Sequence, residues 1–279
     1  MNSGRDDEQQ RRIRDAEQAW HDQLYKTHAA IAYPESAEEF RRLYIKQHLT
    51  GFCDGGLSWW ADARQEMLSQ LGDLRGKRVL DYACGFGTLG MYLSLGGAGV
   101  WGFDLSHHAV ETANRAAERY GLSAQFAQMD AANLAYPDGF FDLVVGFGVL
   151  HHVIKYPQAG PQLHRVLKPD GMGIFHETLW DNPCINFARR FTTVHSDAGD
   201  AALTERAVRS FGSDFRDIKL EKRHLLYMLK RLARLPLYDP AAPAKARPFW
   251  RVVKTLDSQL LRIGQLQRYC GEVIVFLQK

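Results

Sequence analysis

Three things that the sequence has little of narrow its possible functions. Only four cysteines occur among 279 residues, and no two form a C-x-x-C pair. This spacing argues against a disulfide framework and a structural zinc site, and we expect a reduced, cytoplasmic setting. No apolar run is long enough to span a membrane, and the charged N-terminal stretch is unlike a signal peptide. The net charge of +3 is too small to indicate nucleic acid as the main partner.

The chain is rich in apolar residues. Apolar residues make up 46% and charged residues 24%, which suffices for a large buried core. We expect residues 1–57 to form a helical N-terminal lid segment and residues 58–279 to form one α/β domain. Residues 180–250 are irregular, basic, aromatic and interrupted by prolines, so we expect a substrate-lid insert there.

Apolar runs alternate with helical stretches through the middle of the chain. The runs that we expect to be strands are 78–83, 99–105, 124–130, 141–150 and 171–179. Between the second and third runs, apolar residues recur at helical spacing, with Ser106 placed to cap a helix and Gly121 to end it. This alternation predicts a parallel sheet with right-handed crossovers, in which ligands bind beyond the carboxyl ends of the strands.

The first of these runs leads into a glycine-rich turn. The segment RVLDYACGFGTLG contains G-x-G-x-x-G at Gly85, Gly87 and Gly90, a pattern typical of dinucleotide sites. Backbone N–H groups at the start of the next helix suit an anion. However, Asp81 ends the preceding strand, and its carboxylate would repel a pyrophosphate. The same carboxylate suits the ammonium group of S-adenosylmethionine.

Two more acids end the next two predicted strands. Asp104 can accept both hydroxyls of a ribose, and Asp130 can meet the amino group of adenine together with the Ala131 backbone. Three successive strands thus end in acids: Asp81 suits an ammonium group, Asp104 suits the ribose and Asp130 suits the adenine. This set favours S-adenosylmethionine over a nicotinamide cofactor. A nicotinamide-dependent oxidoreductase that uses the glycine loop stays the alternative.

Four segments together resemble the motifs of a known family. VLDYACGFGTLG, GFDLS, QMDAANLAYPDGFFDLVVGFGVLHHV and LHRVLKPDGMGIFHET are similar, in order and spacing, to the class I S-adenosylmethionine-dependent methyltransferases. They resemble most the branch that methylates small molecules, including quinones, sterols and natural products. The resemblance covers about residues 76–179. It implies a Rossmann-like, mostly parallel seven-stranded sheet with an antiparallel last strand, to which residues 215–226 and 272–279 supply the final pair.

The resemblance also implies an activity and its partners. We expect an enzyme that transfers a methyl group from S-adenosyl-L-methionine to a small-molecule acceptor in secondary-metabolite, quinone or lipid-like biosynthesis. The residues expected to bind the cofactor are Asp81, Ala83, Gly85, Gly87, Asp104, Leu105, Asp130, Ala131 and Gly146. A nucleic-acid methyltransferase is a second alternative, but no N/D-P-P-Y tetrapeptide follows the fourth strand. We therefore expect no nucleic-acid partner and no stable membrane insertion, and leave a homodimer open.

Two histidines, His151 and His152, follow the fourth predicted strand at the mouth of the expected site. Either imidazole can take a proton from a substrate hydroxyl or amine, so both are candidate catalytic bases. The alternative is that one histidine packs under the sheet while the other hydrogen-bonds a loop. In that case alignment of the acceptor in a dry pocket carries the reaction, since a sulfonium is already an activated methyl donor.

The sequence contains one candidate metal site, but we do not expect it to bind a metal. Asp181 and Asn182 follow the fifth predicted strand, where magnesium-dependent catechol methyltransferases carry an Asp-Asn pair. Those enzymes also need an acid at the end of the fourth strand, where this chain has Gly146, Phe147 and Gly148. Because a hard cation requires several oxygen ligands, the sequence predicts no bound metal.

Overall fold

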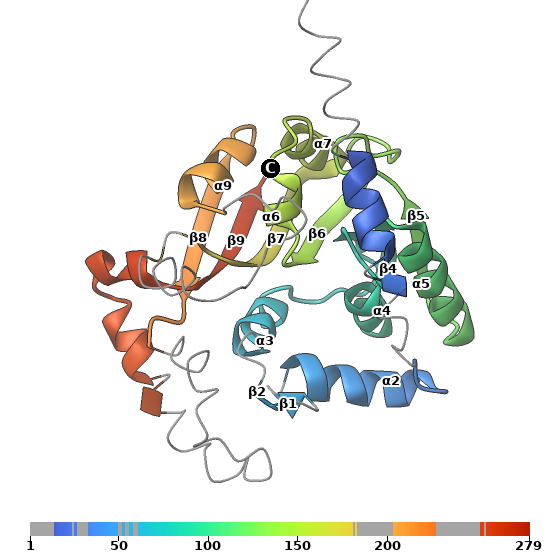
Figure 1. Ribbon diagram of the computed structural model, residues 1–279, viewed down its shortest axis with the longest axis horizontal. Coiled ribbons are helices and arrows are strands. Elements are labelled where there is room, and N and C mark those ends of the chain that lie inside the picture. Colours follow the sequence, from blue (N-terminus) through green and yellow to red (C-terminus); the bar gives the residue numbers. More distant parts are fainter. Residues whose placement is uncertain are drawn as a thin grey trace, which may run out of the picture.

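A seven-stranded sheet forms the centre of the molecule (Figure 1). The structure is a computed structural model, and it describes residues 14–23, 25–26, 33–49, 52–53, 56–57, 61–180, 182, 203–226, 252–253 and 255–279. The strands are β3 (Arg78–Tyr82), β4 (Gly99–Asp104), β5 (Ala124–Gln128), β6 (Phe141–Phe147), β7 (Leu167–Thr178), β8 (Asp217–Arg223) and β9 (Glu272–Gln278). All seven overlap runs that we expect to be strands, although β7 begins at Leu167, before the expected start at residue 171.

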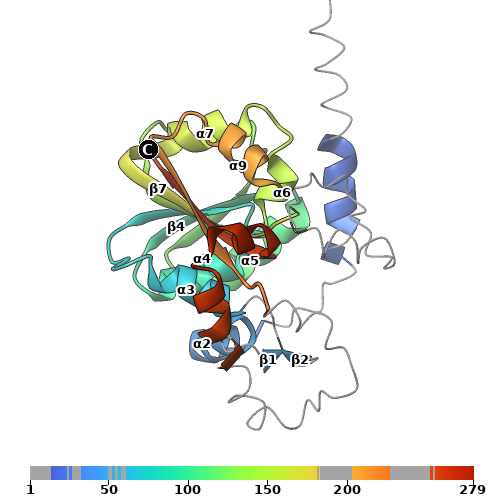
Figure 2. The ribbon, with the colours of Figure 1, turned by 90° about the vertical axis from the view of Figure 1, so that its left-hand side faces the viewer.

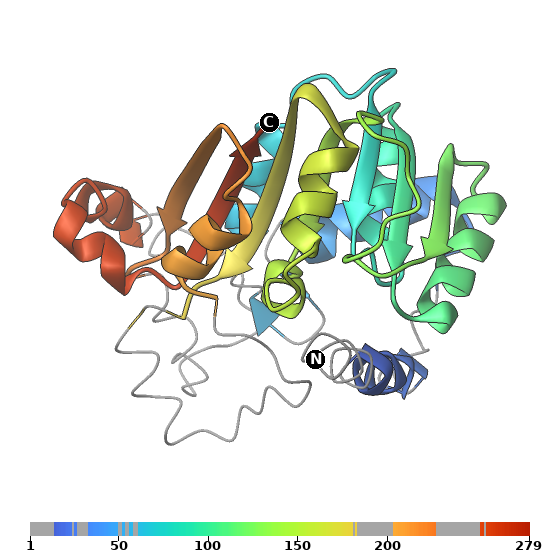
Figure 3. The ribbon, with the colours of Figure 1, turned by 90° about the horizontal axis from the view of Figure 1, so that it is seen from above.

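The strand order is β5-β4-β3-β6-β7-β9-β8, and Figure 3 shows the strands side by side in this spatial order. The pairs β3–β4, β4–β5, β3–β6 and β6–β7 are parallel. Strand β9 lies between β7 and β8 and runs antiparallel to both. The expected Rossmann-like sheet with an antiparallel last strand is confirmed.

Helices cover both faces of this sheet (Figure 2). Core side chains of α6 (Leu150–Val153), α7 (Ala159–Val166) and α9 (Glu205–Phe211) pack on one face. Those of α2 (Ala37–Tyr44), α3 (Ala61–Ser69), α4 (Thr88–Leu95) and α5 (His107–Arg119) pack on the other. Smaller elements are the π-helical turn η1 (Ile45–Leu49), the hairpin of β1 (Phe52–Cys53) with β2 (Gly56–Leu57), and the 3₁₀ turn η2 (Gly264–Tyr269).

Local sequence signals explain where α5 begins and ends. The Ser106 hydroxyl accepts the Ala109 N–H at 3.3 Å, which satisfies one of the free donors in the first turn. After the last turn, Gly121 has a φ of 60°, the left-handed conformation that glycine adopts without steric cost. Both predicted boundaries are confirmed, and they place Asp104 and Leu105 directly before the helix.

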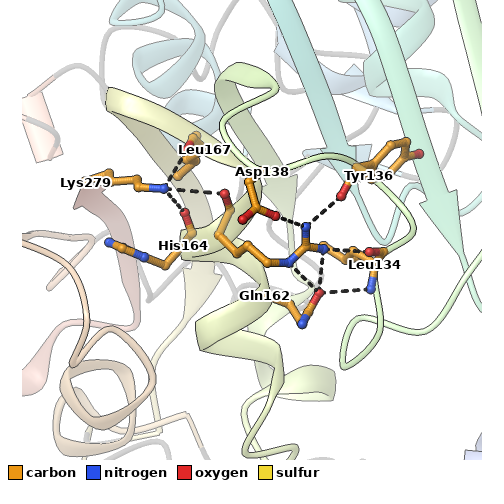
Figure 4. A network of polar contacts seen from close by, with 8 residues as sticks. Leu134, Tyr136, Asp138, Gln162, His164, Leu167 and Lys279 are labelled. Carbon is orange, nitrogen blue, oxygen red and sulfur yellow. Dashed lines mark hydrogen bonds and ion pairs between the residues drawn. The ribbon is translucent and has the colours of Figure 1, made fainter.

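Charged side chains fasten the loop that joins β5 to β6 (Figure 4). The Arg165 guanidinium donates to the carbonyls of Leu134 and Tyr136 and pairs with Asp138 at 2.7 Å. Next to it, the Lys279 ammonium donates to three carbonyls around the end of α7: His164, Arg165 and Leu167. The loop that follows Asp130 is therefore held against α7 by the half-buried Arg165 side chain.

The expected domain division stays a prediction. The N-terminal segment is helical at residues 14–23 and 25–26 and in α2, and we call the first of these the N-terminal helix. Within the expected insert at about 180–250, α9 and β8 belong to the sheet and its cover, whereas residues 181, 183–202 and 227–250 lie outside the described residues. Among the described helices, none combines the length and the apolar character needed to cross a membrane.

Candidate functional site

The glycine loop connects β3 to α4 through left-handed backbone. Ala83, Gly85 and Gly87 have φ values of 50°, 51° and 69°. A Cβ on Gly87 would lie 2.7 Å from the Phe126 ring and 2.9 Å from the Ala113 methyl group, so only glycine fits there. Ala83 adopts the same conformation at a steric cost that glycine would not have. The loop therefore exposes backbone rather than side chains at the start of α4.

Two buried carboxylates hold this loop from below. Asp81 is 2% exposed, and its Oδ2 accepts the Gly90 N–H at 2.8 Å. Asp104 accepts the Gly85 N–H at 2.8 Å and the Ser106 N–H at 2.9 Å. Burial raises the pKa of Asp81 to about 8, against the opposing effect of the Gly90 N–H. Burial also raises the pKa of Asp104, although its two hydrogen bonds and nearby His21 and His152 act in the opposite direction.

A cavity of about 230 Å³ opens at the carboxyl ends of β3, β4 and β6. Seven of the residues predicted from the sequence line it: Ala83, Gly85, Asp104, Leu105, Asp130, Ala131 and His152. The other four lie close to it but are not part of its lining. Asp81 lies under the loop, Gly87 precedes α4, Gly146 lies within β6, and His151 points to Glu177. The roles of all eleven residues stay predictions.

The N-terminal helix contributes side chains to the lining of the cavity. From the sequence we expect a helical lid in this part of the chain, but the sequence did not identify the residues that line the cavity. Arg14, Glu17 and His21 line the cavity from one face of this helix, and Tyr25, in the helical stretch 25–26, lines it as well. Figures 1 and 2 show this helix in dark blue at the same end of the sheet as α6. The Arg14 Nε lies 3.2 Å from Oδ2 of Asp130, the residue expected to contact the amino group of adenine. The helical periodicity of these residues was the signal that could have identified them.

The two candidate catalytic histidines have different surroundings. His152 faces the cavity, and its ring centroid lies 5.3 Å from that of His21. His151 Nδ1 instead lies 3.0 Å from Glu177 Oε2 at the end of β7. The other oxygen of Glu177 accepts the N–H groups of Val149 and Leu150, both at 2.6 Å. Glu177 therefore fixes the first turn of α6 and the orientation of the His151 ring.

A second polar cluster lies at the same end of the sheet, away from the cavity lining. His176 Nε2 and His224 Nδ1 lie 3.0 and 2.9 Å from the same oxygen of Glu272. Burial favours the neutral form of Glu272, but the two histidines outweigh burial and hold its pKa at about 2. The cluster joins β7, β8 and β9 at their ends, a structural role that accounts for His176.

Of the candidate magnesium ligands Asp181 and Asn182, the structure describes only Asn182. Asp181 lies outside the described residues. Asn182 is buried, and its side-chain amide donates to the Tyr269 carbonyl. The expectation that this pair binds no metal stays a prediction.

Comparisons with known proteins agree with this geometry. Residues 79–171 match a family described as "Methyltransferase domain". The chain is 41% identical over 98 residues to a demethylmenaquinone methyltransferase of Thermus thermophilus, covering 34% of this chain and 44% of that protein. It is 29% identical over 204 residues to a sterol 24-C-methyltransferase of Aspergillus fumigatus, covering 70% and 54%. The chain thus spans about half the length of these curated relatives.

A solved structure shows the same fold. An S-adenosylmethionine-dependent methyltransferase from Mesorhizobium loti superposes with a TM-score of 0.54 at 17% identity, covering 80% of this chain and 98% of that one. At this identity the likeness concerns the fold alone. The sequence similarity in residues 79–171 and the strand-end acids carry the functional information.

Proposed function

The chain belongs to the class I S-adenosylmethionine-dependent methyltransferases, and on that premise we propose that it transfers a methyl group to a small-molecule acceptor. Acceptors of the secondary-metabolite, quinone or lipid-like kind fit the proposal best, because the matched relatives include a demethylmenaquinone and a sterol methyltransferase. The observation that carries it is the cavity in which Gly85, Asp104 and Asp130 meet at three adjacent strand ends.

The lining of this cavity fits the cofactor. Carboxylates stand at two neighbouring strand ends, where an adenosine presents its ribose hydroxyls and its amino group. The apolar residues Leu105, Met129 and Ala131 lie in the same lining and suit the faces of a purine. The Asp104 carboxylate keeps acceptor capacity beyond its two backbone hydrogen bonds, because each oxygen has two lone pairs. We assign Asp104 to the ribose, Asp130 to the adenine, and the glycine loop with Asp81 to the methionine moiety.

The cofactor supplies a methyl group on a sulfonium, which is already activated for transfer. The remaining task of the protein is to align the acceptor, exclude water and remove a proton where the acceptor requires it. The N-terminal helix excludes water, since its side chains cover the cavity next to Asp104 and Asp130. His152 contributes its ring to the lining, and Glu177 orients His151 beside it.

Of the two histidines, we assign the role of general base to His151, which is outside the cavity lining but whose ring centroid lies 4.1 Å from that of His152 in the lining. A proton on its Nδ1, donated to the buried Glu177 carboxylate, leaves Nε2 as the acceptor of a substrate proton. The same arrangement stabilises the positive charge that the ring acquires. An acceptor that is already acidic needs no base, and for it alignment alone suffices.

Calorimetry with S-adenosylhomocysteine tests the cofactor assignment. Asp104→Ala should weaken binding by about 1.5–3 kcal/mol, or roughly 10- to 150-fold, because charge-assisted hydrogen bonds are lost. Asp138→Asn is a matched control, since Asp138 is exposed and pairs with Arg165 outside the cavity. Unchanged affinity in Asp104→Ala would remove this residue from the site. Tighter binding of NAD than of S-adenosylhomocysteine would favour the oxidoreductase alternative.

A further inference from the structure

Three side chains with metal-ligating atoms meet above the cofactor cavity. Glu17 and His21 come from the N-terminal helix and His152 from α6. One ligand atom of each lies within 4.8 Å of those of the other two. Glu17 is 6% exposed and belongs to the cavity lining, so its carboxylate is not a solvated surface group. Sequence spacing accounts for the proximity of Glu17 and His21, but only the fold brings His152 to them.

The geometry matches the way in which helices present metal ligands. Glu17 and His21 are four residues apart, so they lie one above the other on the same helical face. Two imidazoles on one tetrahedral zinc, with Zn–N bonds of 2.0–2.1 Å, have ring centroids about 5.2 Å apart. The centroids of His21 and His152 are 5.3 Å apart. The separation of the two rings is therefore compatible with binding to one ion, and the ligand atoms, which lie within 4.8 Å of one another, must move closer together to reach it.

We propose that Glu17, His21 and His152 form a site for a divalent transition-metal ion of the zinc, cobalt or nickel kind. Two imidazoles and one carboxylate are borderline ligands, which suit these ions better than magnesium or calcium. Three protein ligands would leave at least one coordination position for water. The nearby Asp104 carboxylate adds negative charge beneath the site.

The cluster also contains a competing cation. The Lys155 ammonium lies 3.2 Å from one oxygen of Glu17, and the Tyr156 hydroxyl donates to the other. A metal ion must therefore displace the ammonium, whose side chain is 20% exposed and can turn to solvent. Removing the Lys155 charge should strengthen metal binding, whereas removing a ligand should weaken it.

A bound metal ion would hold the N-terminal helix, the cover of the cavity, in its closed position. Two ligands belong to the N-terminal helix and one to α6, so the ion joins the cover of the cavity to its wall. With His152 occupied, the role of base falls to His151, as assigned above. Metal binding should slow entry and release of ligands rather than assist methyl transfer. The site rests on the positions of the three ligands and does not depend on the proposed reaction.

Cobalt titration of tag-free, chelator-treated protein tests the proposal directly. We expect one equivalent of Co²⁺ to bind with the visible absorption of a tetrahedral or five-coordinate site, and Zn²⁺ to displace it. His21→Asn and Glu17→Gln should weaken binding by at least tenfold. Lys155→Met should strengthen it several-fold. His107→Asn, which removes an exposed histidine on α5, should bind as the wild type does.

Two outcomes would overturn the site. One is the absence of saturable binding of a single equivalent by the wild-type protein. The other is binding by His21→Asn and Glu17→Gln that equals that of the wild type. The opposite effect expected for Lys155→Met separates loss of a ligand from loss of folding. Calorimetry with S-adenosylhomocysteine in the absence of metal reports independently on the proposed function.

Discussion

The Nδ1 atom of His151 lies 3.0 Å from Oε2 of Glu177, a carboxylate with no exposed side-chain surface. Glu177 lies at the end of β7, and His151 lies in α6, which follows the adjacent parallel strand β6 at the same edge of the sheet. Glu177 also accepts two N–H groups of the turn that leads to His152. One buried side chain thus sets the geometry of both histidines.

Replacing Glu177 by Gln should lower kcat by roughly 10- to 100-fold and leave the affinity for S-adenosylhomocysteine within about twofold. The amide oxygen of Gln can still accept a backbone N–H. Its NH₂ group, however, donates to Nδ1 of His151, which favours the tautomer with the proton on Nε2, where it cannot accept a substrate proton.

His151→Ala should lower kcat by about 10²–10⁴-fold with an alcohol acceptor, the usual contribution of a general base. Steady-state kinetics and calorimetry measure the two effects separately. If His151→Ala, His152→Ala and the double variant all turn over within tenfold of the wild type, alignment alone carries the reaction.

Cofactor affinity should increase with pH because of Asp81. With a pKa of about 8, this carboxyl is largely neutral at pH 6 to 7. The ammonium group of the ligand favours the ionised form, so binding releases a proton and strengthens by up to about tenfold per pH unit below pH 8. Calorimetry of S-adenosylhomocysteine in buffers of different ionisation enthalpy measures both the affinity and the released proton. Asp81→Asn should bind more weakly and with little pH dependence, and a wild-type profile as flat as that of the variant would contradict the assignment.

Methyl transfer should continue in excess EDTA. The strand end at Gly146–Gly148 offers no carboxylate, and the reaction as proposed uses only the alignment of the acceptor and His151. Initial rates with and without chelator should agree within about twofold, and added Zn²⁺ should lower them if the lid is fastened. Rates that vanish in EDTA and return with Mg²⁺ would instead implicate Asp181 and Asn182.

Ala83→Gly should stabilise the ligand-free protein by about 1 kcal/mol. The φ of 50° at Ala83 is left-handed, where a Cβ is strained and glycine is not. Chemical denaturation of both proteins without ligand gives the free energies of unfolding. Ala98→Gly, at a buried position for which no left-handed φ is found, serves as the control and should be destabilising. A loss of stability in Ala83→Gly would show that the methyl group contributes more by packing than its conformation costs.

The sequence allowed most of the sheet to be predicted because its signals are local. Ser106 and Gly121 mark the two ends of α5, and the acids Asp104 and Asp130 end neighbouring strands that must share an edge. Alternation along a strand also separates His176 from Glu177, since successive side chains point to opposite faces. That rule assigns Glu177 to the side of α6 and His176 to the side of Glu272, as observed.

The lid contacts could not be predicted in the same way. Helical spacing shows that Glu17 and His21 share a face, but it does not show which part of the domain this face meets. Their contacts with Tyr156 and His152 join segments more than a hundred residues apart. Such a pairing depends on the packing of the N-terminal helix as a whole, which no local pattern specifies.

The position of β9 has a consequence for biosynthesis. The ribosome makes β9 last of the seven strands, yet it lies between β7 and β8 and supplies the partner of both. Until β9 has left the exit tunnel, β8 has no neighbour, and one edge of β7 offers unpaired backbone groups. Nascent chains should therefore form β3 to β7 first and complete the sheet only after β9 has left the exit tunnel. In this interval the open edge of β7 is the part of the protein most exposed to chaperones and to pairing with other chains.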